Sequence, residues 1–575
     1  MITSHPTPQF ARSEFRLLDG TWSFEREIRP DRHNCDLSER IVVPFCPESE
    51  LSGIHASVGD GIMYSRTFSV SEKDLAGRLI LHFGAVDFEA TVLINGTAVV
   101  THRGGYTPFS ADIASFCHAG ENRVTVLCRD DIHANVPSGK QTPRDSSFGC
   151  FYTRCTGIWQ SVWLETTPKN EIRSVRFFPH LREQSVEVEV TVRGSGVVRA
   201  EAAFDGRPVG EVEGDITHKR RLTLPLSEAH LWSAGDGQLY EVTIRYGEDT
   251  VHSYFGLREV GYDGYRFLLN DESVFQRLVL DQGYYPEGIY TAKSDDDYIR
   301  DIRLAQEMGF NGARLHQKVF DPRFLYWCDK LGYLVWGEYA SWGVRYSDLS
   351  ALGQFVSEWT EAMERDFNHP SIVTWCPLNE TWEDLDTPGQ VRDVRFIDAV
   401  FGVTKALDDT RPCIDVSGGY HGHNTDIFDF HSYYSSGELK NFISTIAQGK
   451  LEVPALYAGE FAGESNLHYQ AGKPVQASEF GGMAFSPAAN NGWNGDGDEW
   501  GYTAFRTEES FVEEYCKMAG CLLACPEISG FCYTQLYDVE QECNGLFDYY
   551  RRPKFSEDAM RRIAQCNRTR AAVEK

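Results

Sequence analysis

Short apolar runs separated by turn residues fill the first part of the chain. The stretch RLILHFGAVDFEATVLINGTAVV contains two runs of strand length, and NRVTVLCRDD and SVWLETT continue the pattern. Asn95-Gly96 lies between two of these runs, and a two-residue turn of this type predicts a β-hairpin. Apolar runs of this length with regular turn signals are typical of an all-β sandwich, which we expect over residues 1–170.

A second region repeats this pattern on a smaller scale. The runs SVEVEVTV, VRAEAAF, RRLTLPL and YEVTIRYG are separated by Gly, Asp and Pro, and no helix-length pattern interrupts them. About seven short strands in a segment of this length indicate an immunoglobulin-like sandwich. We expect this domain over residues 171–258.

From residue 259 onward, helical stretches alternate with short buried strands. In DDDYIRDIRLAQEMG the apolar residues recur at helical spacing before a Gly, and the strand-like FNGARLH follows. The alternation recurs at DPRFLYWCDKLG-YLVWGE, at LGQFVSEWTEAMERDFNHP-IVTWCPLNE and at VRFIDAVFGVTKALDD-PCIDVSG. This pattern predicts a (β/α)8 TIM barrel over residues 259–575. A doubly wound sheet is the alternative, but no GxGxxG or P-loop is placed to support it.

Composition and charge narrow the classes of partner. With 575 residues, 42% of them hydrophobic, the chain needs several cores. The net charge of -29 argues against nucleic acid and against an anionic membrane surface. The 15 Cys are scattered without a CxxC pair, and we find no signal peptide and no apolar run of about 18 residues. We therefore expect reduced thiols and a cytoplasmic protein.

Polar or ionisable residues stand at the ends of five predicted barrel strands. In a barrel of this kind the chemistry lies at the carboxyl ends of the strands, so we expect these side chains to gather there. They are Arg314 and His316, Trp336 and Glu338, Asn379 and Glu380, His431 and Tyr433, and Glu479.

Two of these carboxyls form the pair that glycoside hydrolysis requires. Glu380 ends the apolar run TWCPLNE, and Glu479 is far enough along the chain for about three β/α units, which puts the two on opposite sides of the barrel mouth. The Asn379 amide is placed to bond a sugar 2-hydroxyl. Glu460 rivals Glu479 because GEFAG and SEFGG are near copies, although the alternation of apolar residues before Glu479 favours the latter.

Other kinds of site are less well supported. His316, His431 and His423 could bind a metal with Glu338 or Asp429, but no HExxH or tight His cluster exists, and we expect neither metal nor cofactor. The loop SGGYHGHN lacks the context of a serine nucleophile, and Cys376 fits a packed thiol. A non-catalytic carbohydrate-binding protein is the alternative from another class.

The chain resembles glycoside hydrolase family 2, which includes β-galactosidases, β-glucuronidases and β-mannosidases. The resemblance covers nearly the whole chain and rests on the motifs LDGTWSF, YTRCTGIWQSVWLE, FNGARLH, DKLGYLVWGE, NHPSIVTWCPLNE, KPVQASEFGG and DVEQECNGLFDYYRRPKF. It implies a jelly-roll, sugar-binding-like sandwich over 1–170, an immunoglobulin-like sandwich over 171–258 and a catalytic barrel over 259–575.

The resemblance also implies roles for individual residues. It makes Glu380 the acid/base and Glu479 the nucleophile of a retaining mechanism, which decides against Glu460. Glu380 must then begin protonated, so we expect a raised pKa. Further residues match the family's sugar-contacting positions, with Tyr433 expected to hydrogen-bond the nucleophile: Asn379, Tyr433, His316, Arg314 and Trp336.

The sugar is less well defined than the reaction. Where β-galactosidases and β-glucuronidases carry a His-rich stretch, this chain has LVLDQGYYPEGIYT, in which Asp281, Tyr284 and Tyr285 line the pocket or form a structural loop. The metal-binding acidic residues of large β-galactosidases have no clear match. The Asn-x-Lys pair that binds the glucuronate carboxylate in β-glucuronidases is missing from CNGLFDYYRRPKF.

We expect a retaining exo-β-glycosidase, β-galactosidase-like, that acts on small oligosaccharides or glycosides. The alternative is a β-hexuronidase, a glucuronidase or galacturonidase, and an arabinosidase is a weaker one. An acidic sugar would be bound by Arg314 and Lys318, or by Arg551 and Arg552. Homo-oligomers are common in the family, but no sequence feature sets a number of subunits.

Overall fold

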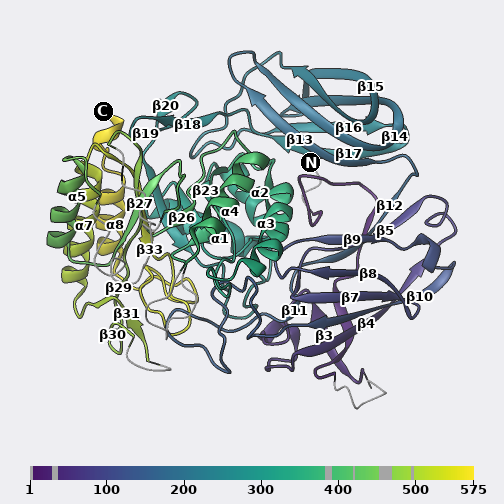
Figure 1. Ribbon diagram of the computed structural model, residues 1–575, viewed down its shortest axis with the longest axis horizontal. Coiled ribbons are helices and arrows are strands. Elements are labelled where there is room, and N and C mark those ends of the chain that lie inside the picture. Colours follow the sequence, from purple (N-terminus) through teal and green to yellow (C-terminus); the bar gives the residue numbers. More distant parts are fainter. Residues whose placement is uncertain are drawn as a thin grey trace.

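The computed structural model describes residues 4–28, 37–381, 392–418, 421–451, 469, 471–493 and 498–575. Glu460, the rival of Glu479, lies outside these residues. Figure 1 shows a barrel wrapped in helices, with two β-sandwiches packed on one side of it. The predicted fold class is confirmed. Within the described residues, no helix is both long and apolar enough to cross a membrane.

The N-terminal sandwich consists of two antiparallel sheets with strand orders β3-β2-β4-β10-β7-β8 and β1-β12-β5-β9, and β6 and β11 form a separate pair. The strands are β1 Phe15–Leu17, β2 Gly20–Glu25, β3 Glu39–Val43, β4 Gly61–Val70, β5 Arg78–Phe83, β6 Val86–Asp87, β7 Glu89–Ile94, β8 Thr97–Arg103, β9 Phe109–Asp112, β10 Gly120–Arg129, β11 Gly157–Ile158 and β12 Val162–Thr167. Short 3-10 helices lie at Glu50–Ser52 and Ala114–Phe116. Alternate residues of the facing strands fill one apolar core between the sheets.

The predicted hairpin at Asn95-Gly96 is confirmed. β7 and β8 are antiparallel neighbours, and Ile94 pairs with Thr97 across the turn. Asn95 has φ of 50° and Gly96 has φ of 85°, as a two-residue hairpin turn of this kind requires.

The second sandwich has fewer and longer strands than the sequence predicted. Its five strands are β13 Ile172–His180, β14 Ser185–Phe204, β15 Arg207–Pro225, β16 Tyr240–Tyr246 and β17 Asp249–Phe255. The runs SVEVEVTV and VRAEAAF are both parts of β14. The β14–β15 register shifts between Thr191 and Ser195, next to Gly194 and Gly196, so an irregularity bends the strand at the point where the sequence indicated its end.

Eight parallel strands form the barrel in the described residues. The sheet order β24-β23-β22-β21-β33-β28-β27 places the first strand beside the last, and β26 pairs with β25, the continuation of β24. The strands are β21 Gln276–Asp281, β22 Gly312–Leu315, β23 Leu334–Glu338, β24 Ile372–Cys376, β25 Leu378–Asn379, β26 Val416–Ser417, β27 Phe428–Ser432, β28 Val475–Gly481 and β33 Ile528–Thr534. Shorter strands flank the barrel: β18 Val260–Asp263, β19 Arg266–Leu269, β20 Glu272–Ser273, β29 Met483–Ala484, β30 Asn490–Asn491, β31 Trp500–Gly501 and β32 Thr503–Ala504.

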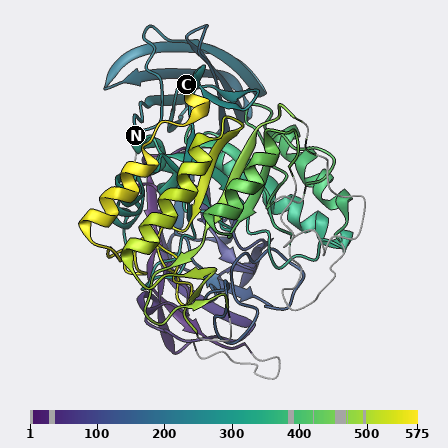
Figure 2. The same ribbon diagram turned by 90° about the vertical axis from the view of Figure 1, so that its left-hand side faces the viewer.

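Helices cover the outside of the barrel, and the four predicted between residues 295 and 409 are confirmed. They are α1 Asp295–Glu307, α2 Pro322–Leu331, α3 Leu352–Asp366, α4 Val394–Leu407, α5 Ser436–Ile446, α7 Glu508–Ala524 and α8 Glu557–Asn567, with 3-10 turns at Leu349–Ala351 and Ala572–Glu574. In Figure 2 the green and yellow helices of the C-terminal part lie side by side over the outer face.

Local sequence sets the ends of these helices. Ser294 and Asp297 form a capping box at the start of α1. Asp321 caps α2, Pro322 takes its first position, and Gly332 ends it with φ of 63°. Each cap fixes where the following strand begins and therefore which residue stands at its carboxyl end.

A buried ion pair joins the C-terminal loop to α1. The Arg551 guanidinium donates to both carboxylate oxygens of Asp301, at 3.0 and 2.9 Å, and to the Tyr284 carbonyl at 2.7 Å. Arg551 also stacks on the Tyr537 ring at 3.6 Å. The adjacent Arg552 is exposed and pairs with Asp548. Arg551 therefore has a structural role in the barrel.

Replacing Arg551 by Met should leave Asp301 as an unpaired buried charge. We expect the barrel to lose on the order of 3–5 kcal/mol of unfolding free energy, measured by chemical denaturation. The matched variant Arg552→Met removes an exposed charge and should change stability by less than about 0.5 kcal/mol. Equal effects of the two substitutions would contradict this role for Arg551.

Candidate active site

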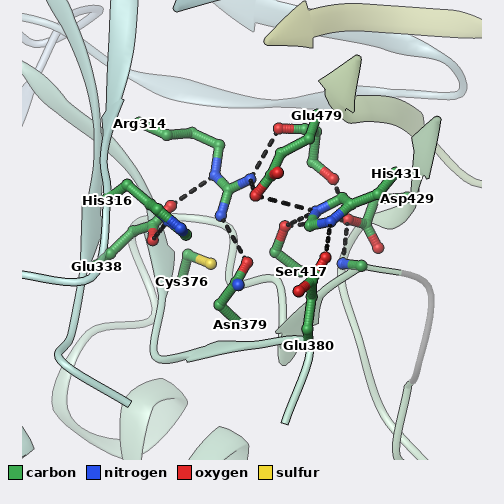
Figure 3. A network of polar contacts seen from close by, with 12 residues as sticks. Arg314, His316, Glu338, Cys376, Asn379, Glu380, Ser417, Asp429, His431 and Glu479 are labelled. Atoms are coloured by element: carbon green, nitrogen blue, oxygen red, sulfur yellow. Dashed lines mark hydrogen bonds and ion pairs between the residues drawn. The ribbon is translucent and has the colours of Figure 1, made fainter. Parts of the chain in front are cut away.

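A buried arginine connects four strand ends at the mouth of the barrel. Arg314, the third residue of β22, is fully buried. Its guanidinium donates to a Glu338 carboxylate oxygen at 2.5 Å, to a Glu479 oxygen at 3.0 Å and to the Asn379 side-chain oxygen at 3.1 Å. Figure 3 shows these contacts converging on one side chain. β22, β23, β25 and β28 are therefore held in one arrangement.

The two predicted catalytic carboxyls stand close together. Potential ligand atoms of Glu380, His431 and Glu479 all lie within 4.8 Å of one another, so one carboxyl oxygen of each glutamate is within that distance. Retaining glycosidases hold their two carboxyl groups about 5–5.5 Å apart, and inverting ones about 6.5–9.5 Å. An oxygen-to-oxygen distance of at most 4.8 Å suits the shorter separation, that of a retaining pair.

The backbone at Glu380 turns away from the regular strand geometry. Glu380 has φ of 50°, and its N–H donates to the Ser417 carbonyl at 2.7 Å. Arg392 donates to the carbonyls of Glu380 and Thr381, at 2.8 Å each. Gly418 leaves room for the side chain, because a Cβ there would lie 2.8 Å from Glu380 Cγ. These contacts hold a left-handed residue in place and aim its carboxyl across the mouth.

Asn379 keeps hydrogen-bonding capacity for a ligand. Its side-chain oxygen accepts from Arg314, which identifies that atom as Oδ1 and turns Nδ2 away. Nδ2 donates no hydrogen bond to the described residues. The geometry therefore suits the predicted contact of Asn379 with a sugar hydroxyl.

The predicted contact between Tyr433 and Glu479 is confirmed. Tyr433 follows β27, and its hydroxyl donates to the second carboxylate oxygen of Glu479. Arg314 donates to the first oxygen. Glu479 is thus bonded on both oxygens, which fixes its orientation.

His431 links the two carboxyls. One imidazole nitrogen is 2.5 Å from a Glu380 oxygen, and the other is 2.9 Å from the Ser417 hydroxyl and 3.5 Å from Glu479. Burial lowers the pKa of His431, but the negative charges of Glu479 and Glu380 outweigh it and leave the pKa raised. His431, one of the predicted strand-end residues, thus contacts both carboxyls directly.

Glu338 and His316 support the arginine from the other side. Glu338 is buried, with one oxygen on Arg314 and the other 2.9 Å from a His316 ring nitrogen. Burial lowers the pKa of His316 well below its ordinary value, and the positive charge of Lys140 adds to this effect. His316 is therefore a neutral imidazole at the edge of the network, and Glu338 orients its neighbours.

Trp336 does not take the predicted place among the sugar-contacting residues. Its side chain is fully buried inside the barrel, and the indole N–H donates to the Gln276 side chain at 2.7 Å. Gln276 begins β21, so the contact lies at the amino end of that strand. Trp336 precedes Glu338 by two residues and points to the same side, one layer deeper.

Asp281 and Lys318 were also predicted to bind substrate, and the structure places them in a closed cluster instead. The Tyr537 hydroxyl donates to Asp281 at 2.5 Å, and burial raises the pKa of Asp281 to about 6. The Lys318 ammonium donates to the carbonyls of Gly283 and Tyr290, and burial lowers its pKa to about 7. The loop after β21 is therefore a structural loop, with Tyr284 and Tyr285 buried in it.

The alternative metal site is not assembled. His423 is largely exposed and pairs with Asp398 at 2.6 Å, apart from His316 and His431. Asp429 lies 3.2 Å from a His421 ring nitrogen and accepts from the Gly418 N–H at 2.8 Å. In the part of the chain described here, one set of three potential ligands comes together, and it consists of the carboxyl pair and His431.

A loop from the N-terminal sandwich reaches this site, which the sequence did not indicate. The N–H groups of Ser138 and Gly139 donate to the Trp342 carbonyl at 2.8 and 3.1 Å. The Trp342 indole in turn donates to the Asn379 carbonyl at 3.0 Å. The sandwich therefore forms one wall beside the barrel mouth. The signal available in advance was PSGKQTP, a Gly-Lys pair in a long connection between strands.

Sequence models of one family match three successive segments of the chain. They are described as the sugar binding domain of glycosyl hydrolases family 2 at residues 50–168, glycosyl hydrolases family 2 at residues 170–258, and the TIM barrel domain of that family at residues 291–518. Together they span most of the chain.

Individual proteins are similar over long stretches. A putative beta-glucuronidase of Formosa agariphila is 26% identical over 440 residues, which are 72% of this chain and 52% of that protein, so this chain matches about half of its length. A beta-galactosidase of Thermoanaerobacter pseudethanolicus is 26% identical over 424 residues, covering 68% of this chain and 52% of that protein. The crystal structure of a beta-galacturonidase from Eisenbergiella tayi, bound to galacturonate, has a TM-score of 0.75 at 21% identity and covers 99% of both chains.

The contact between His431 and Glu380 predicts a pH effect. Below its raised pKa the imidazole is positive, and a positive neighbour favours the ionised form of a carboxyl. Replacing His431 by Asn should therefore raise the pKa of Glu380. We expect the alkaline limb of the kcat/KM profile to move up by about one pH unit, together with a fall in kcat.

The matched control is His423→Asn, which removes an exposed imidazole paired with Asp398. It should leave the profile unchanged. An alkaline limb that stays in place or moves down in the His431→Asn variant would show that His431 does not act on the acid.

Proposed function

Because the chain belongs to glycoside hydrolase family 2 and is an O-glycosyl hydrolase, we propose that it is a retaining exo-β-hexuronidase with Glu380 as acid/base and Glu479 as nucleophile. The observation that carries the mechanism is that one carboxyl oxygen of Glu380 lies within 4.8 Å of one carboxyl oxygen of Glu479. The choice of a uronic acid as the sugar rests on the names of the sequence relatives.

In the first step, the ionised Glu479 attacks the anomeric carbon. Arg314 and Tyr433 orient its two oxygens. Glu380 gives its proton to the glycosidic oxygen, which leaves with the aglycone as an alcohol. The sugar is then bound to Glu479 through an ester.

In the second step, water enters where the aglycone stood. The ester has no negative charge, so the electrostatic cost of ionising Glu380 is lower. Glu380 takes a proton from the water, which attacks the anomeric carbon and releases Glu479. Two inversions give net retention. The Asn379 amide hydrogen-bonds the 2-hydroxyl and strengthens that bond in the transition state.

Uronic acid as the sugar is supported by the relatives rather than by an Asn-x-Lys pair. Besides the Formosa protein, relatives at 24–26% identity from Pongo abelii, Homo sapiens, Rattus norvegicus and Paenibacillus borealis are named beta-glucuronidase. The sequence led us to expect a β-galactosidase-like enzyme, with a β-hexuronidase as the alternative. The similarity to the Thermoanaerobacter beta-galactosidase keeps the neutral sugar as the second candidate.

A panel of four substrates tests this proposal. Purified protein is assayed on the p-nitrophenyl glycosides of β-glucuronate, β-galacturonate, β-galactose and α-L-arabinose under one set of conditions. We expect kcat/KM on one of the two uronides to exceed that on the β-galactoside by about 100-fold or more, because sites built for a charged group reject analogues that lack it. A higher kcat/KM on the galactoside would overturn the choice of sugar and leave the mechanism intact.

A further inference from the structure

Lys140 is brought to the barrel mouth by the sandwich loop described above. Gly139, with φ of 60°, lies so close to the barrel that a Cβ there would be 2.3 Å from the Gln317 carbonyl oxygen. A residue with a side chain could not follow this path. The backbone bonds to Trp342 and this close approach fix the start of the Lys140 side chain.

The Lys140 ammonium lies over the Trp342 ring, 4.5 Å from its centre. The same indole donates to the Asn379 carbonyl, one residue before Glu380. The cation therefore lies on the face of an indole whose N–H is bonded to the residue before Glu380. Lys140 is only 8% exposed.

Among the residues that the structure describes, none forms an ion pair with the ammonium. The ammonium makes no hydrogen bond with them either, and its contact is the face of the indole. Taking an ammonium out of water is costly unless an anion compensates. Burial lowers the pKa of Lys140, but the charges of Cys150, Glu542, Glu479 and Glu380 outweigh it and leave the pKa raised. Lys140 is therefore a charged group that has negative groups nearby but no direct hydrogen bond or ion pair to the described residues.

Other cations near the site are already bonded. Arg314 is bonded to Glu338, Glu479 and Asn379. Lys318 donates to two backbone carbonyls, and Arg551 is paired with Asp301. Neither route that the sequence suggested for binding an acidic sugar is therefore available.

One competing anion, the Glu542 carboxylate, is already hydrogen-bonded. Glu542 accepts from the Tyr152 hydroxyl at 2.5 Å and from the Asn544 amide at 2.9 Å. Burial raises the pKa of Glu542, an effect that the positive charge of Lys140 opposes. Asn544 also accepts from Gln535 at 2.7 Å. In the segment CNGLFDYYRRPKF, which lacks the Asn-x-Lys pair, the Asn544 side chain is thus already hydrogen-bonded within the protein. The segment supplies no cation to the site.

We propose that Lys140 binds the carboxylate of the hexuronide and so determines specificity for acidic sugars. The inference rests on the proposed hexuronidase function. Within it, the uronate oxygen is the anion that the Lys140 ammonium lacks, and the Trp342 ring holds the ammonium in position to receive it. A cation from the N-terminal sandwich then binds the uronate carboxylate in place of the Asn-x-Lys pair, which the segment CNGLFDYYRRPKF lacks.

The test compares wild type with Lys140→Met on the p-nitrophenyl β-uronide that wild type cleaves and on the β-galactoside. Met keeps an unbranched side chain over Trp342 and removes the charge. We expect kcat/KM for the uronide to fall on the order of 100-fold, mainly through KM, because one charge-assisted hydrogen bond is lost. The value for the galactoside should change by less than about 3-fold. Lys140→Arg should recover part of the uronide activity.

The control is Lys73→Met, which removes an exposed charge on the same sandwich, where Lys73 pairs with Glu14. Its activity should equal that of wild type. A thermal melt of each variant separates loss of fold from loss of binding, and the Ki of free D-glucuronate or D-galacturonate gives a second measure that does not depend on turnover.

The outcomes separate the two proposals. If wild type cleaves uronides and Lys140→Met is unaffected, or loses both activities equally, Lys140 is not the specificity residue and the hexuronidase proposal stands. If wild type cleaves neutral glycosides alone, the hexuronidase proposal fails, and the assignment of Lys140 fails with it.

Discussion

The arrangement of the active site depends on one buried guanidinium. Arg314 has no exposure to solvent, and its charge is offset by the carboxylates of Glu338 and Glu479. A buried ion pair stabilises a fold only when its geometry is good and its remaining hydrogen bonds are made, and here the Ser478 carbonyl and Asn379 complete the set. The same bonds that offset the cost of burial also hold Glu479 and Asn379 in place. The same contacts therefore stabilise the barrel mouth and orient the reacting groups.

The two carboxyls of the pair, Glu380 and Glu479, lie in different surroundings. Glu479 accepts hydrogen bonds from Arg314 and Tyr433, one on each carboxylate oxygen. Glu380 is less buried than Glu479 and contacts His431. It follows a short strand, and its backbone leaves the strand conformation there. Two carboxyls in different surroundings can hold different protonation states at one pH, which acid–base catalysis by a retaining pair requires. The first sandwich adds Lys140 and the backbone N–H groups that bond to Trp342.

Much of the fold and part of the site followed from the sequence. Alternating helical and strand patterns predicted the barrel because each element buries one face, and the strand ends predicted Arg314, Asn379, Glu380, His431 and Glu479 as neighbours. Trp336 was misplaced because a residue near a strand's end faces either the mouth or the deeper layer, and sequence alone does not tell which. Asp281 and Lys318 look available in the sequence, since the partners that close over them, such as Tyr537, are remote along the chain. Lys140 was missed for the same reason: its place depends on how a sandwich loop packs on the barrel.

The formation of a covalent intermediate on Glu479 is the central claim, and trapping tests it most directly. The protein is incubated with 2-deoxy-2-fluoro-β-glucuronyl fluoride or its galacturonyl epimer, whose fluorine at C2 slows hydrolysis of the ester, and is then analysed by intact mass and peptide mapping. The account predicts one fluorosugar per chain, attached to Glu479 within β28 and absent from Glu479→Gln. A label on Glu380, or inactivation and turnover without any covalent adduct, would contradict it.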